Sequence, residues 1–222
     1  SKDQTVTYNV FSSNYLEVDI LKSLKFKQTA GVSYVGSNNY SYYGRNTLDG
    51  RGDTNGRASQ SDSWNTRLTL ESMLTYDKVF KKDHHLNVMA AFTAERSDYG
   101  SKAISVYDFD NDYMLMWNLG AAKKQDKSRS GRGMSSLASV LGRVNYNLKE
   151  RYLLTASFRY DGSSKFSKDN RWAFFPSVAL AWRASEESFI KNWNVFSNLK
   201  LRASYGQTGN QAIGSYQTVS SL

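Results

Sequence analysis

The chain of 222 residues contains no cysteine, one proline and two histidines. Without cysteine it has no disulfide framework, no thiolate metal site and no cysteine nucleophile. The single proline, Pro176, leaves few interruptions to regular structure. No apolar run approaches the roughly 20 residues of a membrane-spanning helix, and the first residues, SKDQTVTYNV, show no apolar signal core. Any role within a membrane therefore requires β-strands.

The composition and the net charge indicate an ordered, basic chain. Hydrophobic residues make up 40% and aromatic residues 14% of the sequence, which is too apolar and aromatic for a disordered protein. The formal net charge of +9 indicates an acidic partner, such as nucleic acid, phospholipid headgroups or the phosphates of lipopolysaccharide. Because the basic residues are scattered along the chain, a solvated surface or lumen explains them more simply.

Three amphipathic runs lie between Arg151 and Gln211, within RYLLTASFRYDGSSKF, NRWAFFPSVALAWRASEESF and NLKLRASYGQTGNQ. In each run, every second residue is apolar and the residues between are mostly small or polar, which predicts strands with one apolar face. The apolar positions are Tyr152, Leu154, Ala156, Phe158 and Tyr160, then Phe174, Pro176, Val178, Leu180 and Trp182, then Leu199, Leu201, Ala203 and Tyr205.

The same period of two recurs upstream, in residues 5–20, 24–34, 65–76, 86–96 and 136–148. The sequence therefore predicts an all-β fold, an antiparallel meander of about eight strands. Short turns are expected at residues 21–23, 77–83 and 149–151, and a short helical turn within ASEESFIKNWNVFSN. Long polar connections are expected at about 36–63, 97–134, 161–171 and 206–222.

Short connections alternating with long ones are typical of an outer-membrane barrel, whose turns are short on one side and whose loops are long on the other. Predicted strands of roughly 10 residues match a tilted membrane crossing. Aromatic residues cluster near the predicted strand ends, as interfacial girdles do; they are Tyr34, Trp64, Tyr76, Tyr146, Tyr152, Tyr160, Trp172, Trp182 and Tyr205. These features favour part of a transmembrane β-barrel over a soluble sandwich.

A barrel wall places its polar positions toward a lumen. The charged residues expected on that face are Lys25, Lys27, Arg67, Glu71, Arg143, Arg159 and Arg202. Pro176 cannot donate a hydrogen bond to a neighbouring strand, so we expect a bulge or a missing hydrogen bond there.

Two groups of residues resemble metal ligands. Asp108, Asp110 and Asp112 alternate like the start of a calcium loop, but Tyr113 and Leu119 occupy the positions of the required glycine and glutamate. A solvated acidic loop is the simpler interpretation. His84 and His85 are adjacent in a predicted turn, where neighbouring side chains point to opposite faces, so shared ligation is unfavourable. We therefore expect no metal and no other cofactor.

Loop aromatics are the main candidates for binding. Stacking on sugar rings or contact with a partner protein is one interpretation, and ordinary loop packing is the other; the residues are Tyr40, Tyr42, Tyr43, Tyr107, Tyr113 and Trp117. The RGD sequence at residues 51–53 is a coincidence of three residues. No catalytic constellation is recognisable, so the chain is not expected to be an enzyme.

The sequence from Tyr152 onward resembles the barrel of SusC/RagA-type TonB-dependent outer-membrane transporters, through RYLLTASFRYDGSSKF, NRWAFFPSVALAWR, SEESFI and NLKLRASYGQTGNQAIG. Upstream, YLEVDILKSLKFK, LTYDKVF, HHLNVMAAF and LGRVNYNLKERYLL are similar to the same family in the same order. Within these motifs, the turn residues Asp161, Gly162, Ser163, Ser164, Thr208, Gly209 and Asn210 serve either turn geometry or contact with a lid, and geometry is favoured.

The resemblance implies a middle-to-late segment, residues 1–222, of a large barrel in the outer membrane of a Gram-negative bacterium. It also implies a plug domain, coupling to the TonB–ExbB–ExbD complex through that plug, a SusD-like surface lipoprotein as lid, contact with outer-membrane lipid and lipopolysaccharide, and import of an oligosaccharide or a peptide. No nucleic-acid partner is expected in that setting.

Two alternatives stay open on the sequence alone. One is a free-standing eight-stranded membrane barrel, which requires its first and last strands to pair. The other is a basic soluble β protein that binds polysaccharide or nucleic acid through its aromatic residues.

Overall fold

The structure is a computed structural model that describes residues 1–209. Strands account for most of these residues, which confirms the predicted all-β class. The strands are β1 (Lys2–Leu21), β2 (Leu24–Tyr43), β3 (Arg57–Phe80), β4 (His84–Phe109), β5 (Ala122–Gln125), β6 (Arg129–Leu148), β7 (Tyr152–Ser163), β8 (Trp172–Trp182) and β9 (Leu201–Gly206). The helical elements are the 3₁₀ turns η1 (Gly52–Thr54), η2 (Leu115–Trp117), η3 (Leu119–Ala121), η4 (Lys168–Asn170) and η5 (Ala184–Glu186), and the short helix α1 (Ser188–Lys191).

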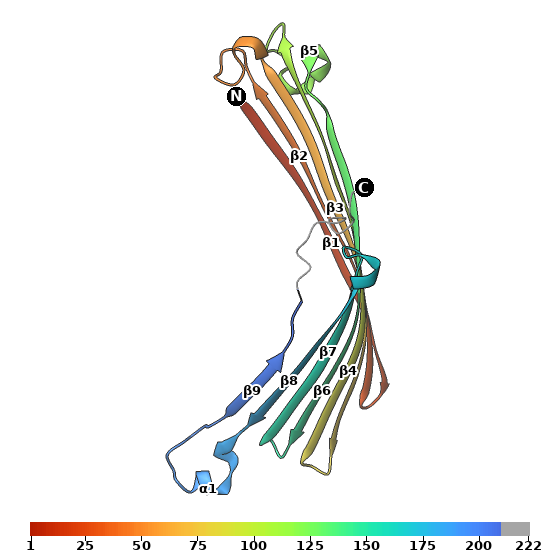
Figure 1. Ribbon diagram of the computed structural model, residues 1–222, viewed down its shortest axis with the longest axis vertical. Helices are drawn as coiled ribbons and strands as arrows, with labels where there is room; N and C mark the ends of the chain where they lie inside the picture. The colour runs from red at the N-terminus through yellow and green to blue at the C-terminus, as the bar shows by residue number, and fades with distance from the viewer. Residues whose placement is uncertain (210–222) are drawn as a thin grey trace. The chain divides into compact units, whose positions relative to one another are not determined.

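The strands form one sheet in the order β1-β2-β3-β4-β6-β7-β8-β9, with β5 paired to β4 beside this path (Figure 1). The order follows the chain, as expected for an antiparallel meander. Within the described residues β1 and β9 form the two edges of the sheet and do not pair with each other. The sheet is therefore open, which contradicts a free-standing eight-stranded barrel. No helix among residues 1–209 has the length and apolar character needed to cross a membrane.

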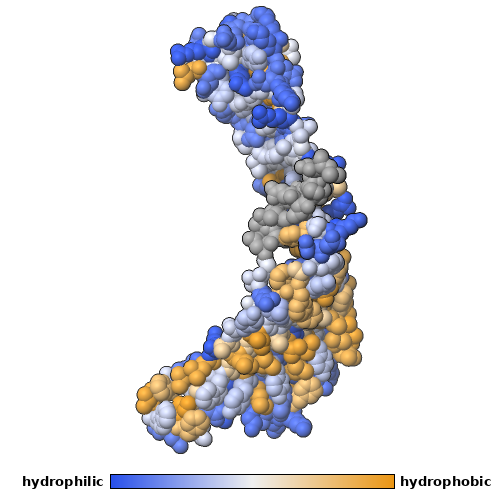
Figure 2. Space-filling view, viewed as in Figure 1, coloured by the Kyte–Doolittle hydropathy of each residue, from blue (hydrophilic) through white to orange (hydrophobic). Residues whose placement is uncertain are grey.

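The chain divides into two compact units. The loop unit comprises Ser1–Ser12, Gly31–Leu68 and Ser97–Met134, and the wall unit comprises Ser13–Ala30, Thr69–Arg96 and the described residues from Ser135 onward. Hydrophilic residues cover the loop unit in Figure 2, whereas hydrophobic residues gather on the surface of the wall unit. The two units thus present surfaces of different polarity.

The apolar positions of the wall unit are opposite one another across the strands. Tyr152 of β7 pairs with Trp182 of β8, and Tyr160 pairs with Phe174. Leu180 of β8 pairs with Ala203 of β9. Side chains such as Phe174 (54% exposed) and Leu180 (57% exposed) have no core to enter. An antiparallel sheet with one apolar and exposed face fits a barrel wall whose outer face contacts lipid, and we call it the lipid face.

Aromatic rings mark two levels on the lipid face. Tyr152 and Trp182 are paired at one level, and the rings of Tyr160 and Trp172 stack 4.9 Å apart at the other. Tyr152 and Tyr160 are eight residues apart, or ~27 Å along the strand. At a strand tilt of about 40° this spans ~20 Å, close to the apolar band of outer-membrane barrels. Tyr205, in contrast, pairs with Val178 between the two levels and does not belong to either girdle.

The loop unit has a small hydrophobic core of its own. It consists of Tyr42, Ala58, Val106, Phe109 and Met116, all buried. Backbone hydrogen bonds fix the 44–56 connection against β4, because the amides of Asp108 and Phe109 donate to the carbonyls of Gly56 and Asn55 at 3.1 and 3.0 Å. The long connection is therefore a packed structure.

Short turns are present, as predicted, between β1 and β2, between β3 and β4 and between β6 and β7. The limits predicted for the second turn, 77–83, are wrong, because β3 continues to Phe80 and β4 begins at His84, so both histidines lie in a strand. The predicted short helical turn is also present, as η5 and α1. The limits predicted for the first two long connections, 36–63 and 97–134, are wrong. β2 continues to Tyr43, β3 begins at Arg57, β4 continues to Phe109 and β6 begins at Arg129. The extensions of β3 and β6 are mostly polar, and the extension of β4 has only a few apolar residues at its end, such as Val106 and Phe109, so none shows a sustained apolar alternation.

Of the two alternatives predicted at Pro176, the bulge is wrong and the missing hydrogen bond is confirmed. The β7–β8 register is one-to-one through the pair Phe158 and Pro176. On the other side, the β8–β9 ladder ends at Ser177, and the amide of Gln207 donates to the carbonyl of Pro176 at 3.0 Å. Since the nitrogen and carbonyl of a strand residue point to the same neighbour, the missing N–H of Pro176 faces β9 at the ladder's end. The sheet accommodates the proline there without inserting a residue.

Candidate functional site

The face opposite the lipid face of β6–β9 is polar. The register places Arg143, Ser157, Ser177 and Gly206 in one row across the four strands. The next row contains Leu141, Arg159 and Phe175. Arg143, Arg159 and Arg202 therefore lie on the face that the sequence predicts as lumenal. In a barrel this face surrounds the interior, and we call it the lumenal face.

Arg159 is fixed in place by two neighbours. Its Nε donates to both carboxylate oxygens of Asp161, at 2.6 and 2.7 Å, and one terminal nitrogen donates to Ser139 Oγ at 3.0 Å. An arginine held this way keeps further N–H donors for a ligand, because its guanidinium carries five. The neighbouring Ser157 and Ser177 hydroxyls form a hydrogen bond of 2.7 Å with each other.

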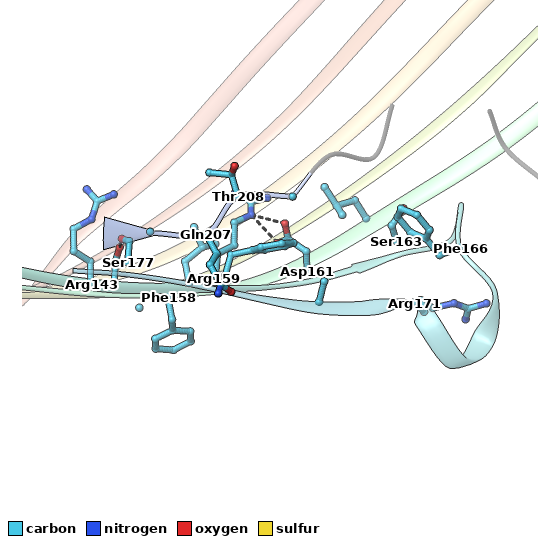
Figure 3. A pocket seen from close by; sticks show the side chains of 18 of the residues that line it. Arg143, Phe158, Arg159, Asp161, Ser163, Phe166, Arg171, Ser177, Gln207 and Thr208 are labelled. Carbon is cyan, nitrogen blue, oxygen red and sulfur yellow. Dashed lines mark hydrogen bonds and ion pairs between the residues drawn. The ribbon is translucent and has the colours of Figure 1, made fainter. Parts of the chain in front are cut away.

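A hollow of about 860 Å³ lies on the lumenal face over these rows. Its lining includes Arg143, Arg159, Arg171, Phe166 and Phe175. Figure 3 shows Phe158 on the opposite side of the sheet from Arg143 and Thr208, and it marks the contacts between Arg159 and Asp161. The hollow is therefore a feature of the lumenal face, with Arg159 near its middle and Arg143 and Arg171 toward its two ends.

The family turn residues have structural partners. Asp161, Gly162 and Ser163 end β7. A Cβ on Gly162 would come within 2.6 Å of the Trp172 ring, so the ring lies against this glycine. Ser164 exchanges hydrogen bonds with Ser136, through its amide at 2.9 Å and its hydroxyl at 2.8 Å. These contacts favour the role in geometry. Thr208 and Gly209 line the hollow, and Asn210 lies outside the described residues.

The predicted loop aromatics do not share one surface. Tyr42 is 2% exposed, and its hydroxyl donates to Asp112 at 2.6 Å. The rings of Tyr40 and Trp117 lie 5.1 Å apart, and Trp117 remains 56% exposed. The other three, Tyr43, Tyr107 and Tyr113, differ in exposure, and Tyr113 is 87% exposed. Tyr113 and Trp117 are therefore the members best placed for a binding surface.

The three alternating aspartates have separate partners. Asp108 accepts from Asn55 at 3.0 Å, Asp110 pairs with Lys123, and Asp112 pairs with Arg45 at 3.3 Å. Among residues 1–209, no group of three or more histidine or acidic side chains is arranged to hold a metal ion. Asp108 and Asp112 contact the 44–56 connection, through Asn55 and Arg45, whereas Asp110 contacts β5 through Lys123.

The two histidines contact different residues. His84 Nδ1 lies 2.6 Å from the Tyr146 hydroxyl, and His85 Nε2 lies 3.0 Å from Asp77. Asp77 also accepts from Asn87 at 2.7 Å. Adjacent strand residues point to opposite faces, as expected, and each histidine joins the turn end of β4 to another strand.

Glu187 joins the segment after β8 to the β6–β7 turn. Its carboxylate accepts hydrogen bonds from the Tyr152 hydroxyl, from Trp182 Nε1 at 3.3 Å and from Arg151 at 3.2 Å. The hydrogen bond from Tyr152, followed by that from Trp182, lowers the pKa of Glu187 below its ordinary 4.5. This carboxylate therefore holds the turn region together in its ionised form.

We expect acid to loosen this connection. Because the pKa of Glu187 is lowered in the folded protein, its contribution is present above pH 4.5 and is lost as the pH falls through the lowered pKa. Hydrogen-exchange protection of residues 184–191 in the full-length protein should therefore decrease in acid, and Glu187→Gln should show reduced protection already at pH 7. Glu150→Gln, which alters an exposed ion pair with Arg183, is the matched control. Wild-type protection at pH 7 in Glu187→Gln would contradict the role.

The sequence predicts some residues of the hollow, such as Arg143, Arg159 and Thr208, and misses others. Arg171, Phe166 and Phe175 were not singled out, and neither were the small residues below them. The available signal was a series of small residues at alternate positions of β8, interrupted once by Phe175; they are Ala173, Ser177, Ala179 and Ala181. This signal could not be interpreted as a hollow without the strand register, which places Ser177 between Ser157 and Gly206.

Fold and site together define a class of protein. An antiparallel meander with one lipid face, two aromatic levels and an arginine-bearing lumenal face is a segment of the wall of a transmembrane β-barrel. The comparisons agree and are more specific. The chain belongs to the TonB dependent receptor-like β-barrel family, whose sequence model matches residues 2–220.

Known relatives refine this assignment. A TonB-dependent receptor of Formosa agariphila is 32% identical over 207 residues, covering 93% of this chain and 20% of the relative. The TonB-dependent receptor SusC of Bacteroides thetaiotaomicron is 58% identical over 80 residues, which is 36% of this chain and 8% of SusC. The chain thus spans about a fifth of the length of the relatives that match it over most of its length.

Solved structures share the fold. The structure of the RagAB peptide transporter superposes with a TM-score of 0.88 at 22% identity, covering 97% of this chain and 24% of the other. The RagAB importer in its open-open state gives a TM-score of 0.86. The chain is therefore a barrel segment of the SusC/RagA type, located in the outer membrane. This overturns the soluble alternative.

Proposed function

We propose that this chain is part of the wall of a TonB-dependent importer that takes up an oligosaccharide or a peptide. The observation that carries the proposal is the separation of the two faces of β6–β9 in a chain of this family. The lipid face holds Phe174 and Leu180 exposed, while the lumenal face holds Arg143 and Arg159 around a hollow. A wall with these two faces anchors in lipid and surrounds a polar path.

Partners of the whole protein extend this proposal. The SusC and RagAB relatives support a SusD-like lipoprotein as lid and energy coupling through TonB. Exposed apolar side chains of the loop unit, including Tyr113, Trp117 and Leu48, suit contact with such a lid or with sugar rings, since aromatic rings combine an apolar face with adaptable polar edges.

Uptake by the full-length transporter tests the proposal. Cells expressing it should accumulate a labelled oligosaccharide or oligopeptide mixture from the medium, and deletion of the TonB gene should abolish accumulation above the level of cells without the transporter. Accumulation of neither class, or equal accumulation without TonB, would contradict an energised importer.

Removing the exposed loop rings should weaken recognition. We expect the double variant Tyr113→Ala and Trp117→Ala to raise the substrate concentration for half-maximal uptake by about tenfold, since each ring contact contributes about 0.5–1.5 kcal/mol. Phe11→Ala removes a ring from β1 whose exposure, 77%, lies between those of Trp117 and Tyr113, and it is the matched control. If the double variant reached half-maximal uptake at the same substrate concentration as the wild type, these rings would not take part in binding.

A further inference from the structure

We propose that the hollow on the lumenal face of β6–β9 is a binding site for a carboxylate-bearing group of the imported substrate, with the carboxylate among arginines and its apolar neighbour against two phenyl rings. The inference rests on the proposed import function, and it specifies where on the wall the substrate binds and by which chemistry. Its basis is the shape, the charge and the apolar side of the hollow.

The shape follows from small residues at adjacent register positions. Ser157, Ser177 and Gly206 lie side by side on β7, β8 and β9, and Ala173 lies two rows further along β8. None of these side chains rises far from the sheet. The longer side chains of Arg143, Arg159 and Phe175 surround them. A floor of small residues within a ring of large ones is a concave site, as ligand sites usually are.

The hollow carries a positive charge, and two of its three arginine side chains have no acidic partner in the described part of the chain. Arg159 is neutralised by Asp161, at 2.6 Å. The side chains of Arg143 and Arg171 also line the hollow, and neither forms a hydrogen bond or ion pair with another residue of the described part of the chain. The guanidinium group matches the geometry of a carboxylate and binds it with two parallel hydrogen bonds. Arg143 lies beside the hydroxyl pair of Ser157 and Ser177, whereas Arg171 lies at the far end of the hollow, just before β8. A guanidinium group without a partner among the described residues, beside two hydroxyls, favours an anionic ligand.

An aromatic wall defines the rest of the ligand. Phe166 and Phe175 are half-buried and line the same hollow. The Phe175 ring lies against Gly209, where an added Cβ would come within 2.2 Å of it. A simple inorganic anion would still leave the remaining apolar surface of both rings in water. A carboxylate attached to a carbon chain or a sugar ring would fill both the charged and the apolar part, which removes apolar surface from water.

Because the chain contains no cysteine, a single Ser177→Cys substitution can report on the floor of the hollow. It is introduced into the purified full-length transporter freed of cysteine elsewhere. Two thiol reagents are compared, the anionic 2-sulfonatoethyl and the cationic 2-trimethylammonioethyl methanethiosulfonate. We expect the anionic reagent to react faster. Adding Arg143→Gln should lower the ratio of the two rates roughly threefold to sevenfold, the effect of one charge about 7 Å away in a watery, salt-screened site.

Matched variants interpret the result. Arg143→Lys keeps the charge and should retain most of the preference for the anionic reagent. Lys102→Gln removes a positive charge from an exposed ion pair with Asp62, 3.2 Å apart, and should leave the ratio of the two rates unchanged. Equal rates for the two reagents would overturn the proposal. No reaction with either reagent would also overturn it, because another part of the protein then fills the hollow. These rates are measured without transport, so a failure of TonB-dependent uptake is seen separately.

Discussion

Replacing Val178 with arginine should prevent or severely weaken assembly of the barrel, whereas arginine at the adjacent Ala179 should be tolerated. Val178 is paired with Ala156 and Tyr205 on the lipid face, between the two aromatic levels. A charged side chain at this depth costs about 2–4 kcal/mol in outer-membrane barrels. Ala179 is paired with Thr155 and Ser204 on the lumenal face, where a charged group stays in contact with water.

The measurement is the urea dependence of folding of the full-length transporter in lipid vesicles, with the heat-dependent shift in electrophoretic mobility as the signal for the folded barrel. We expect a lower urea midpoint for Val178→Arg and a nearly unchanged one for Ala179→Arg. Val178→Leu, which keeps the lipid face apolar, controls for the change in size. If the two arginine variants lost equal stability, the assignment of the two faces would be wrong.

The faces could be predicted from the sequence because they depend only on a period of two within each strand. From Leu154 to Phe158, apolar residues alternate with Thr155 and Ser157, and successive side chains of a strand point to opposite faces. The pairing of neighbouring strands was also partly predictable, since short connections such as Lys149–Arg151 force antiparallel neighbours. Compartment followed from the position of the aromatic residues.

The extent of the strands was not predictable in the same way. Residues 57–63 belong to β3 and residues 97–109 to β4, although both segments read as polar connections. In the loop unit the strands are held by backbone hydrogen bonds and by ion pairs such as Arg57–Asp126, 2.6 Å apart. Such interactions join residues far apart in the chain and leave no periodic signal in either segment.

The sequence predicted which arginines lie on the lumenal face, but it did not predict where on that face a binding site would form. Arg143 and Arg159 were expected on the lumenal face, and that expectation depends on local alternation alone. The hollow depends on the exact alignment of four strands, which brings Ser157 beside Ser177 and Gly206. A shift of one residue in one strand would move its small residue to the other face, so the site exists only once the register is set.

Gly50→Ala should disrupt the 44–56 connection of the loop unit. A Cβ at this position would lie 2.2 Å from the carbonyl oxygen of Gly44 and 2.5 Å from that of Tyr43. Both contacts are with backbone, so no side-chain rotation relieves them, and overpacking of this kind costs about 1–3 kcal/mol. The carbonyl of Gly50 also accepts from the amide of Gly56 at 2.7 Å. A displacement of Gly50 therefore also disturbs Gly56, whose carbonyl accepts the hydrogen bond from the amide of Asp108 in β4.

Trypsin cleavage at Arg45 and Arg51 in the full-length transporter measures this effect, because a displaced connection exposes its backbone to the protease. We expect rapid cleavage in Gly50→Ala and little change in Gly131→Ala, since the added methyl group there meets no atom within 4 Å. Gly52→Ala should be intermediate, because its φ of 72° costs an alanine about 1 kcal/mol although the space is open. The heat-dependent mobility shift should persist in all three variants, since the wall unit has its own strand pairing. Equal cleavage rates in Gly50→Ala and Gly131→Ala would mean that the 44–56 connection does not require a glycine at residue 50. Loss of the mobility shift would mean that the wall unit cannot assemble without an intact loop unit.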